Sequence, residues 1–372
     1  MENNKTPKIR FKGFTDPWEQ RKLGELCNIT TGKLDANAMV SDGQYDFYTS
    51  GIDVFKIDVA AFEGPAITIA GNGASVGYMH LADGKFNAYQ RTYVLTDFLA
   101  DRQFLNVAIG NELPDKIQEE VRGSGIPYIV LNMLTDLAIP FPSHEEQYAI
   151  GVYFQQLDNL ITLHQRKYNK LLNVKKSMLE KMFPKNGSNI PEIRFKGFTD
   201  PWEQRKVFEI ADRFDNLRVP VAANLRIPGN TPYYGANGIQ DYVEGYTHDG
   251  EYILVAEDGA SDLKNYPVNY VNGRIWVNNH AHVLQGKEKI ANNKFLSYAM
   301  SLADIESVLV GGGRAKLNAD IMMNLDIAIP SFNEQEQIGT YFSNLDHLIT
   351  LHQRELEKLQ NIKKSMLEKM FV

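Results

Sequence analysis

A long internal repeat constrains this chain more than any local motif does. The fourteen residues Ile9–Lys22 return unchanged as Ile193–Lys206. Two further segments are also repeated: Ile161–Arg166 as Ile349–Arg354, and Lys175–Phe183 as Lys363–Phe371. A repeat of this period predicts one structural plan that is used twice. Each copy would contain an opening segment, a variable globular block and a long helix.

The two globular blocks, Leu23–Pro142 and Val207–Pro330, have drifted to faint similarity, whereas the segments around them are nearly copied. Copied surfaces predict one kind of partner that binds twice, and diverged surfaces predict two different targets. The repeat divides the chain into four expected parts: a first domain over 1–142, a central helix over 143–185, a second domain over 186–330 and a terminal helix over 331–372.

Composition narrows the class of protein. Of the 372 residues, 43% are hydrophobic and 11% are aromatic, which is enough for packed cores. The single cysteine, Cys27, excludes an internal disulfide. Because there is no apolar run of about 18 residues and no signal-peptide pattern, the sequence predicts a soluble cytoplasmic protein.

The net charge of −7 argues against coating nucleic acid by bulk charge. Positive charge is concentrated locally instead. The range Phe154–Lys185 contains seven Lys and Arg residues and two carboxylates, which gives a net charge of +5. A solvated helix face would explain this basic segment equally well.

Both long helices carry a start signal of the same form: Ser143 three residues before Glu146, and Ser331 three residues before Glu334. In such a capping box the serine oxygen accepts from a free backbone N–H, and the glutamate reaches back to the cap. Pro184 predicts the end of the first helix, and the second should run to the chain end. About 40 residues at 1.5 Å per residue give a rod of about 60 Å.

A heptad seam follows both helices, at steps of three and four residues: Phe154, Leu157, Ile161, His164, Tyr168, Leu171, Lys175, Met178 and Met182, and then Phe342, Leu345, Ile349, His352, Leu356, Leu359, Lys363, Met366 and Met370. The seam predicts a long antiparallel two-helix coiled coil, with a pseudo-two-fold, that separates the two blocks. Leucines beside the seam, such as Leu160 and Leu348, widen its apolar face. His164 and His352 are expected to fix the helix register and not to bind metal.

Both blocks are expected to be mixed α+β domains of one α/β fold. Their short apolar runs, Pro65–Ala70 and Glu251–Ala256, predict strands that end in glycine turns. Phe86–Leu95 and Ile275–Leu284 are expected to be strands with many polar side chains. A glycine cluster near the end of each block, at 123–125 or 311–314, precedes a Leu-Asn pair and a last apolar run.

These features together resemble the DNA-specificity (S) subunit of type I restriction–modification enzymes. The resemblance is carried by the segment Gly13–Glu25 and by Pro142-Ser-x-x-Glu-Gln147-x-x-Ile150, which leads into a long helix. Both recur in the second half as Gly197–Lys206 and as Pro330-Ser-x-x-Glu-Gln335-x-x-Ile338. One departure is that Leu23-Gly24-Glu25 becomes Val207-Phe208-Glu209, which is expected to alter a short turn.

The resemblance implies two target-recognition domains, each of which reads one half of an asymmetric, bipartite site in double-stranded DNA. It implies two modification (M) subunits that carry S-adenosylmethionine and methylate adenine. It also implies restriction (R) subunits that use ATP and Mg and cleave DNA. The specificity subunit itself would bind no cofactor and catalyse nothing. The helices would set the spacing between the two readers, near one turn of the duplex, about 34–36 Å.

Candidate DNA contacts are side chains that can reach base edges or phosphates from glycine turns and polar strands. In the first block they are Lys33, Asn72, Ser75, Gln90, Arg91, Arg122 and Ser124. In the second block they are Asn237, Ser261, Lys264, Asn278, Asn279, His280, Arg314 and Lys316. An ordinary surface role is the alternative for each of them.

Three other functions have weaker support. Gly73-Ala-Ser-Val-Gly77 fits the hydrolase pattern G-x-S-x-G, but a nucleophile elbow must open a helix, and the next residues predict a hairpin. Asn230-Thr-Pro-Tyr233 approaches the Asn-Pro-Pro-Tyr of adenine methyltransferases, but Thr231 replaces the required proline. The main alternative is a coiled-coil scaffold whose globular domains bind proteins. It does not explain two diverged blocks that are rich in polar turns.

Overall fold

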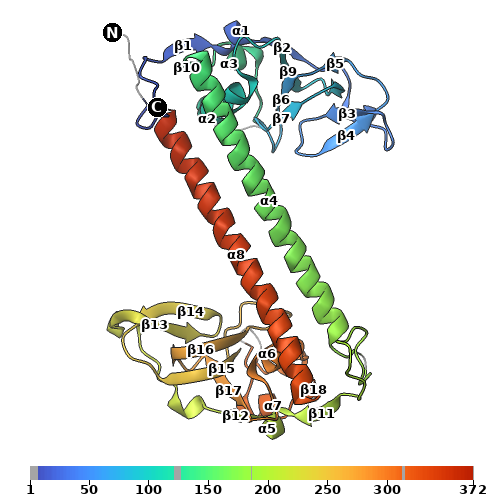
Figure 1. Ribbon diagram of the computed structural model, residues 1–372, viewed down its shortest axis with the longest axis vertical. Helices are drawn as coiled ribbons and strands as arrows, with labels where there is room; N and C mark the ends of the chain where they lie inside the picture. Colours follow the sequence, from blue (N-terminus) through green and yellow to red (C-terminus); the bar gives the residue numbers. More distant parts are fainter. Residues whose placement is uncertain (1–6, 121–126, 186, 312–314, 372) are drawn as a thin grey trace. The chain divides into compact units, whose positions relative to one another are not determined.

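A computed structural model describes residues 7–120, 127–185, 187–311 and 315–371. The chain divides into two compact units, shown in Figure 1. Unit 1 comprises residues 1–166 and 353–372, and unit 2 comprises residues 167–352. Each long helix passes without a break from one unit into the other.

Unit 1 contains, in chain order, β1 (Glu19–Lys22), α1 (Leu23–Leu26), β2 (Asn28–Thr31), the 3-10 helix η1 (Ala36–Ala38), β3 (Tyr45–Tyr48), β4 (Val54–Ile57), β5 (Phe62–Glu63), β6 (Ala66–Ala70), β7 (Met79–Ala82), β8 (Lys85–Ala88), β9 (Thr92–Thr96), α2 (Arg102–Glu120), α3 (Leu131–Thr135), β10 (Ala138–Phe141) and the first part of α4 (His144–Met182). The strands form sheets in the orders β2-β9-β6-β7, β4-β3-β8-β5 and β1-β10. Helix α2 packs on β6 and β7.

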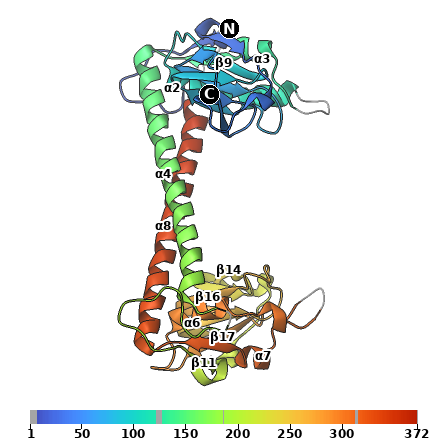
Figure 2. The same ribbon diagram turned by 90° about the vertical axis from the view of Figure 1, so that its right-hand side faces the viewer.

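Unit 2 contains, in chain order, β11 (Glu203–Lys206), α5 (Val207–Ile210), β12 (Ala211–Arg213), the 3-10 helices η2 (Asp215–Leu217) and η3 (Ala223–Leu225), β13 (Pro228–Gly235), β14 (Gly238–Val243), β15 (His248–Ala256), β16 (Val268–Val277), β17 (Ala281–Gly286), α6 (Asn293–Ser301), η4 (Glu306–Val308), α7 (Ala319–Met323), β18 (Asp326–Ile329) and the start of α8 (Phe332–Met370). One sheet has the order β12-β17-β15-β16-β13-β14, and β11 pairs with β18. Helix α6 packs on β15, β16 and β17, as Figure 2 shows.

The two units repeat one strand plan. The central strand β6 pairs antiparallel with β9, and its counterpart β15 pairs antiparallel with β17. The parallel pair β3–β8 has its counterpart in the parallel pair β13–β16. In each unit the opening strand pairs with the strand just before the long helix, as β1 with β10 and β11 with β18. This confirms the duplicated mixed α/β fold expected from the sequence.

Within each unit the two long helices pack antiparallel. In unit 1 the beginning of α4, with Phe154, shares a core with the end of α8, with Met370. In unit 2 the end of α4, with Met182, shares a core with the beginning of α8, with Phe342. The pairing follows from the seam, because a buried apolar stripe on one helix needs an apolar stripe on the other.

Two matching ion pairs follow the same register. Lys363 contacts Asp158 at 2.6 Å in unit 1, and Lys175 contacts Asp346 at 2.5 Å in unit 2. Both lysines occupy seam positions, where an unpaired ammonium would be costly to bury. An aspartate of the opposite helix pairs with each lysine in the same way, and the two ion pairs help to fix the register of the helices.

The glutamates of the expected capping boxes have a different role from the one predicted. Ser143 does accept the N–H of Glu146, at 3.4 Å. The carboxylate of Glu146 is instead bound by Arg10, at 2.9 and 2.6 Å, and by Trp18 Nε1 at 3.0 Å. Leaving a fully buried carboxylate without a charged partner costs more free energy than leaving one helix N–H without a side-chain cap. The repeated opening segment therefore stabilises the start of the long helix by pairing with its buried glutamate.

The expected long strands Phe86–Leu95 and Ile275–Leu284 are each interrupted by a turn. The first splits into β8 and β9 around residues 89–91, and the second into β16 and β17 around residues 278–280. The strand interpretation was therefore wrong in the middle of each segment. The polar residues there are turn residues. The backbone N–H of Tyr89 bonds to the Tyr48 carbonyl at the end of β3, and that of Asn278 bonds to the Tyr234 carbonyl in β13.

Among the described residues, none of the helices combines the length and the apolar composition of a membrane-spanning helix.

Ser75 lies in a turn that leads into strand β7 and does not open a helix. A nucleophile elbow requires a strand-to-helix turn, so the geometry does not support the hydrolase pattern at this serine.

Replacing Leu157 and Leu345 by aspartate is expected to destabilise both units, by about 3 kcal/mol or more at each site, because both leucines lie in the seam and are at most 8% exposed. Thermal unfolding of the full chain measures the effect. Leu160→Asp with Leu348→Asp is the matched control, since these neighbours are 45% and 43% exposed. Equal losses of stability in the two double variants would contradict the seam.

Candidate nucleic-acid interface

Four loops of the first domain meet at the ends of its central strands. They comprise residues 32–34, 49–51, 71–75 and 89–91, and we call them the first edge. Gly71 donates its N–H to the Arg91 carbonyl at 2.9 Å, and Gln90 donates its N–H to the Leu34 carbonyl at 2.8 Å. Ser50 Oγ donates to Asn72 Oδ1 at 2.7 Å. Loops that are distant in sequence thus form one polar surface.

The candidate residues of the first block gather on this edge. Lys33, Gln90 and Arg91 are exposed, whereas Asn72 and Ser75 are half-buried. Gln90 Nε2 reaches Asp35 Oδ2 at 3.5 Å, and Asn72 is engaged by Ser50. The first edge therefore presents three exposed side chains with donor groups. Arg122 and Ser124 lie outside the described residues.

The second domain has an equivalent set of loops, at residues 235–238, 257–261, 278–280 and 316–317, which we call the second edge. Glu257 donates its N–H to the His280 carbonyl at 2.8 Å. Asn237 Nδ2 donates to the Gly259 carbonyl at 2.9 Å, and Asn237 Oδ1 accepts from the N–H of Ser261 at 2.7 Å. Asn237 therefore ties two of these loops together.

The candidate residues of the second block have unequal surroundings. Asn237, Ser261, Asn279 and Lys316 are exposed, whereas Asn278 is only 4% exposed. Asn278 Oδ1 accepts from the N–H of His280 at 2.8 Å, so the side chain of Asn278 stabilises the turn at 278–280. Lys264 lies in an adjoining turn at 262–265. Arg314 lies outside the described residues.

Sheet register makes the two edges equivalent. Ala70 pairs with Thr92 at the end of β6, and Ala256 pairs with Ala281 at the end of β15. The turns that precede β9 and β17 therefore occupy the same place in both domains. Gln90 and Arg91 of the first edge correspond to Asn279 and His280 of the second. One backbone frame thus presents different side chains.

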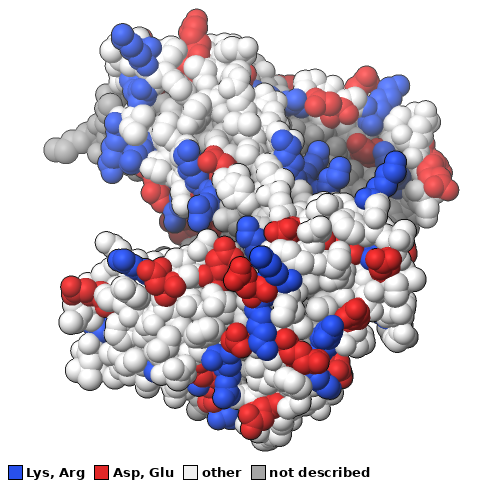
Figure 3. Space-filling view, turned by 60° about the horizontal axis from the view of Figure 1, so that its bottom comes forward, with Lys and Arg blue, Asp and Glu red and all other residues white. Residues whose placement is uncertain are grey.

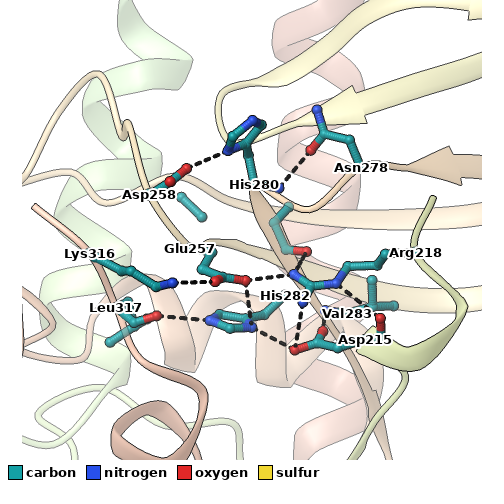
Figure 4. Close-up of polar contacts among 12 residues, drawn as sticks. Asp215, Arg218, Glu257, Asp258, Asn278, His280, His282, Val283, Lys316 and Leu317 are labelled. Carbon is teal, nitrogen blue, oxygen red and sulfur yellow. Dashed lines mark hydrogen bonds and ion pairs between the residues drawn. The ribbon is translucent and has the colours of Figure 1, made fainter. Parts of the chain in front are cut away.

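A buried charge network lies beneath the second edge, as Figure 4 shows. Glu257 accepts from Arg218 at 2.7 Å and pairs with Lys316 at 2.9 Å. His282 contacts Asp215 Oδ2 through Nδ1 at 2.7 Å. Sequence reasoning missed every member except Lys316. Its residues are scattered between positions 215 and 316, and only the pairing of β12, β15 and β17 brings them together.

The network holds both of its carboxylates in the ionised form. Burial alone would raise the pKa of Asp215, but the hydrogen bond and charge of His282 outweigh it and lower that pKa. Burial would likewise raise the pKa of Glu257, and its hydrogen bonds with Lys316 and Arg218 lower it. Donor atoms of Asp215, Glu257 and His282 lie within 4.8 Å of one another, the spacing of a metal site. The two cations already bound to these carboxylates disfavour a metal ion there.

Surface charge is mixed on the face shown in Figure 3. Lys and Arg side chains stand in small groups with Asp and Glu side chains nearby. This distribution agrees with the net charge of −7. Phosphate contacts would therefore depend on local groups of donors and not on a continuous basic surface.

Comparison with known proteins identifies the family. A family model described as the type I restriction modification DNA specificity domain matches residues 15–173 and again residues 199–361. The chain belongs to this specificity family. The two matches fall on the two copies of the repeat, and each covers an opening strand, a recognition block and most of the long helix that follows.

Two curated relatives are similar to parts of this chain. The Haemophilus influenzae protein described as "Putative type I restriction enzyme specificity subunit S.HindORF215P" is 44% identical over 154 residues. The EcoDI specificity subunit of Escherichia coli is 43% identical over 144 residues. These alignments cover 41% and 39% of this chain, and they span only 39% and 31% of the relatives' own lengths.

A solved structure shares the whole fold. The S subunit of a type I restriction–modification system from M. genitalium aligns with a TM-score of 0.77 over 99% of both chains. The two sequences are 18% identical, so this likeness concerns the fold alone. It agrees with the duplicated mixed α/β architecture of this specificity-family chain.

Proposed function

We propose that this chain is the DNA-specificity subunit of a type I restriction–modification complex, and that each edge reads one half of a bipartite site in double-stranded DNA. The observation that carries the proposal is the equivalence of the two edges. One backbone frame, built twice, presents Gln90 and Arg91 in one domain and Asn279 and His280 in the other. Equivalent frames with different side chains suit one task performed on two sequences.

The exposed side chains of both edges suit base and phosphate recognition. Arg91 can donate to guanine O6 and N7, and Gln90 or Asn279 can bond to adenine N6 and N7. Lys33 and Lys316 can approach phosphates, although Lys316 already pairs with Glu257.

Two copied helix surfaces support the binding of two M subunits. Leu160 and Leu163 on α4 are each 45% exposed, and their counterparts Leu348 and Leu351 on α8 are 43% and 42% exposed. The run Leu160–Arg166, which contains the first two leucines, is identical to Leu348–Arg354. Exposed leucines do not stabilise the isolated chain. Binding of one M subunit to each copy explains why both helices have these leucines. R subunits, which would use ATP and Mg, complete the proposed complex.

We predict that the purified chain transfers no methyl group by itself. In this proposal S-adenosylmethionine binds to the M subunits, and this chain supplies only recognition. The assay is transfer from labelled S-adenosylmethionine to DNA, with and without M subunits. Incorporation of label in the absence of M would contradict the assignment of a non-catalytic subunit.

Sequence-specific DNA retention tests the proposed function directly. Methylated adenines are first mapped in cells that express this chain with its M partner. The purified complex is then bound to a duplex with the mapped site and to a scrambled duplex, at one stated salt concentration. The specific duplex should bind at least about 10³-fold more tightly. Equal binding would favour the alternative of a coiled-coil scaffold whose domains bind proteins.

A further inference from the structure

Hydrogen bonds between uncharged groups hold the loops of the first edge together, and we call this set of bonds the clamp. Gly71 donates its N–H to the Arg91 carbonyl at 2.9 Å and accepts from the N–H of Ile129 at 2.7 Å. The Ile129 carbonyl in turn accepts from the hydroxyl of Tyr93 at 2.9 Å. A Cβ on Gly71 would collide with the Arg91 carbonyl and meet the Tyr93 ring at 3.1 Å. The ring therefore lies close against Gly71 and leaves little room for a side chain there.

The second edge has the same backbone clamp with different side chains. Glu257 donates its N–H to the His280 carbonyl at 2.8 Å and accepts from the N–H of Leu317 at 2.7 Å. The Leu317 carbonyl faces Nε2 of His282 at 2.9 Å. His282 thus stands where the first domain has Tyr93, and Glu257 stands where the first domain has Gly71.

His282 must carry a proton on each ring nitrogen to serve this clamp. Its Nε2 faces the Leu317 carbonyl, and its Nδ1 faces the carboxylate of Asp215 at 2.7 Å. Both partners are acceptors, so both nitrogens must donate, and the ring is an imidazolium. A neutral ring has one N–H and would leave one acceptor without a donor. His282 is 1% exposed, so water cannot easily replace the lost bond.

The charged and titratable groups around His282 come from every neighbouring element: Arg213, Asp215, Arg218, His248, Glu257, Asp258, Tyr266, His280 and Lys316. Asp215 and Glu257 have lowered pKa values and stay ionised at neutral pH. Burial lowers the pKa of His248, and burial raises the pKa of Tyr266 to about 12.

We propose that His282 is a positioning residue of the second edge: as an imidazolium it holds Leu317, and through Leu317 the loop at 257–261, in the geometry that reads the second half-site. The inference rests on the proposed function of both edges. Loss of the two ring N–H groups releases Asp215 and the Leu317 carbonyl. Reading of the second half-site then weakens, while reading of the first, which Tyr93 supports, does not.

The test uses the complex of this chain with its M subunits. Binding is measured at one stated pH and salt concentration with three duplexes: the mapped site, the site with its first half scrambled and the site with its second half scrambled. The ratio of the affinities for the mapped and the scrambled duplex gives the discrimination at each half-site.

Variants separate the two half-sites. His282→Gln should lower discrimination at the second half-site about tenfold and leave discrimination at the first constant. The matched variant Tyr93→Phe removes the corresponding hydroxyl and should weaken only the first half-site. In NMR spectra of the full chain with isotope-labelled histidine, the ring of His282 should carry a proton on each nitrogen. Equal losses at both half-sites in His282→Gln, or a single N–H on the His282 ring, would overturn the proposal.

The failure of the proposed function would look different. If scrambling either half leaves binding unchanged, the edges do not read DNA. If scrambling weakens binding but His282→Gln affects the two half-sites alike, only the positioning role of His282 is refuted.

Discussion

Replacing Arg10 by methionine is expected to lower the free energy of unfolding by about 3–5 kcal/mol, because it leaves the buried carboxylate of Glu146 without its cation. Trp18 would remain as a single neutral donor. The hydrogen bond from Arg10 to Glu146 raises the pKa of Arg10, so the guanidinium stays charged at every accessible pH. Urea unfolding of the full chain measures the loss.

Arg21→Met is the matched control, since Arg21 belongs to the same copied segment but forms an exposed pair with Glu19. Its effect should stay within about 0.5 kcal/mol. The double variant Arg10→Met with Glu146→Gln removes the unpaired charge and should recover most of the loss. If Arg10→Met and Arg21→Met unfold at the same urea concentration, the buried pair has no special role.

Exchange of the second block, Val207–Pro330, for that of another family member is expected to change only one half of the recognised site. The physical reason is that each unit has its own core and its own edge, so neither edge depends on the side chains of the other. Discrimination between the old and new half-sites should change by about 10³-fold or more. Mapping of methylated adenines measures the outcome.

A block exchange that keeps the residues of β11 and β18 is the cleanest design, because this strand pair anchors the block beside α8. Exchange of the first block, Leu23–Pro142, is the matched experiment and should alter the other half-site. Alteration of both half-sites by a single exchange would contradict independent reading. The cofactor assignments, the R subunits and the cytoplasmic location remain predictions.

Local signals were enough to place the long helices. Helix α4 begins at His144, directly after Ser143, and ends at Met182, just before Pro184. Helix α8 begins at Phe332, directly after Ser331. Caps and prolines act within one turn of chain, so the sequence alone exposes them. The apolar runs Pro65–Ala70 and Glu251–Ala256 likewise predicted the strands Ala66–Ala70 and His248–Ala256, although the second strand begins earlier than its apolar run.

The site was predictable only in part. Glycine turns and polar runs led to Gln90, Arg91, Asn279 and His280, and these residues do lie on the two edges. The same reasoning treated Asn278 as a contact, although it is buried and bonded to the backbone of His280. Turn chemistry was missed there, because a polar strand and a polar turn share one composition.

The sequence by itself determined the duplication, the two amphipathic helices and the family, since each of these depends on repeated or periodic residues. Only the tertiary structure decided which residues meet. Arg10 finds Glu146 across 136 positions, and His282 finds Asp215 across 67. Strand pairing and the cost of an unpaired buried charge determine such partners. Neither of them produces a periodic pattern in the sequence.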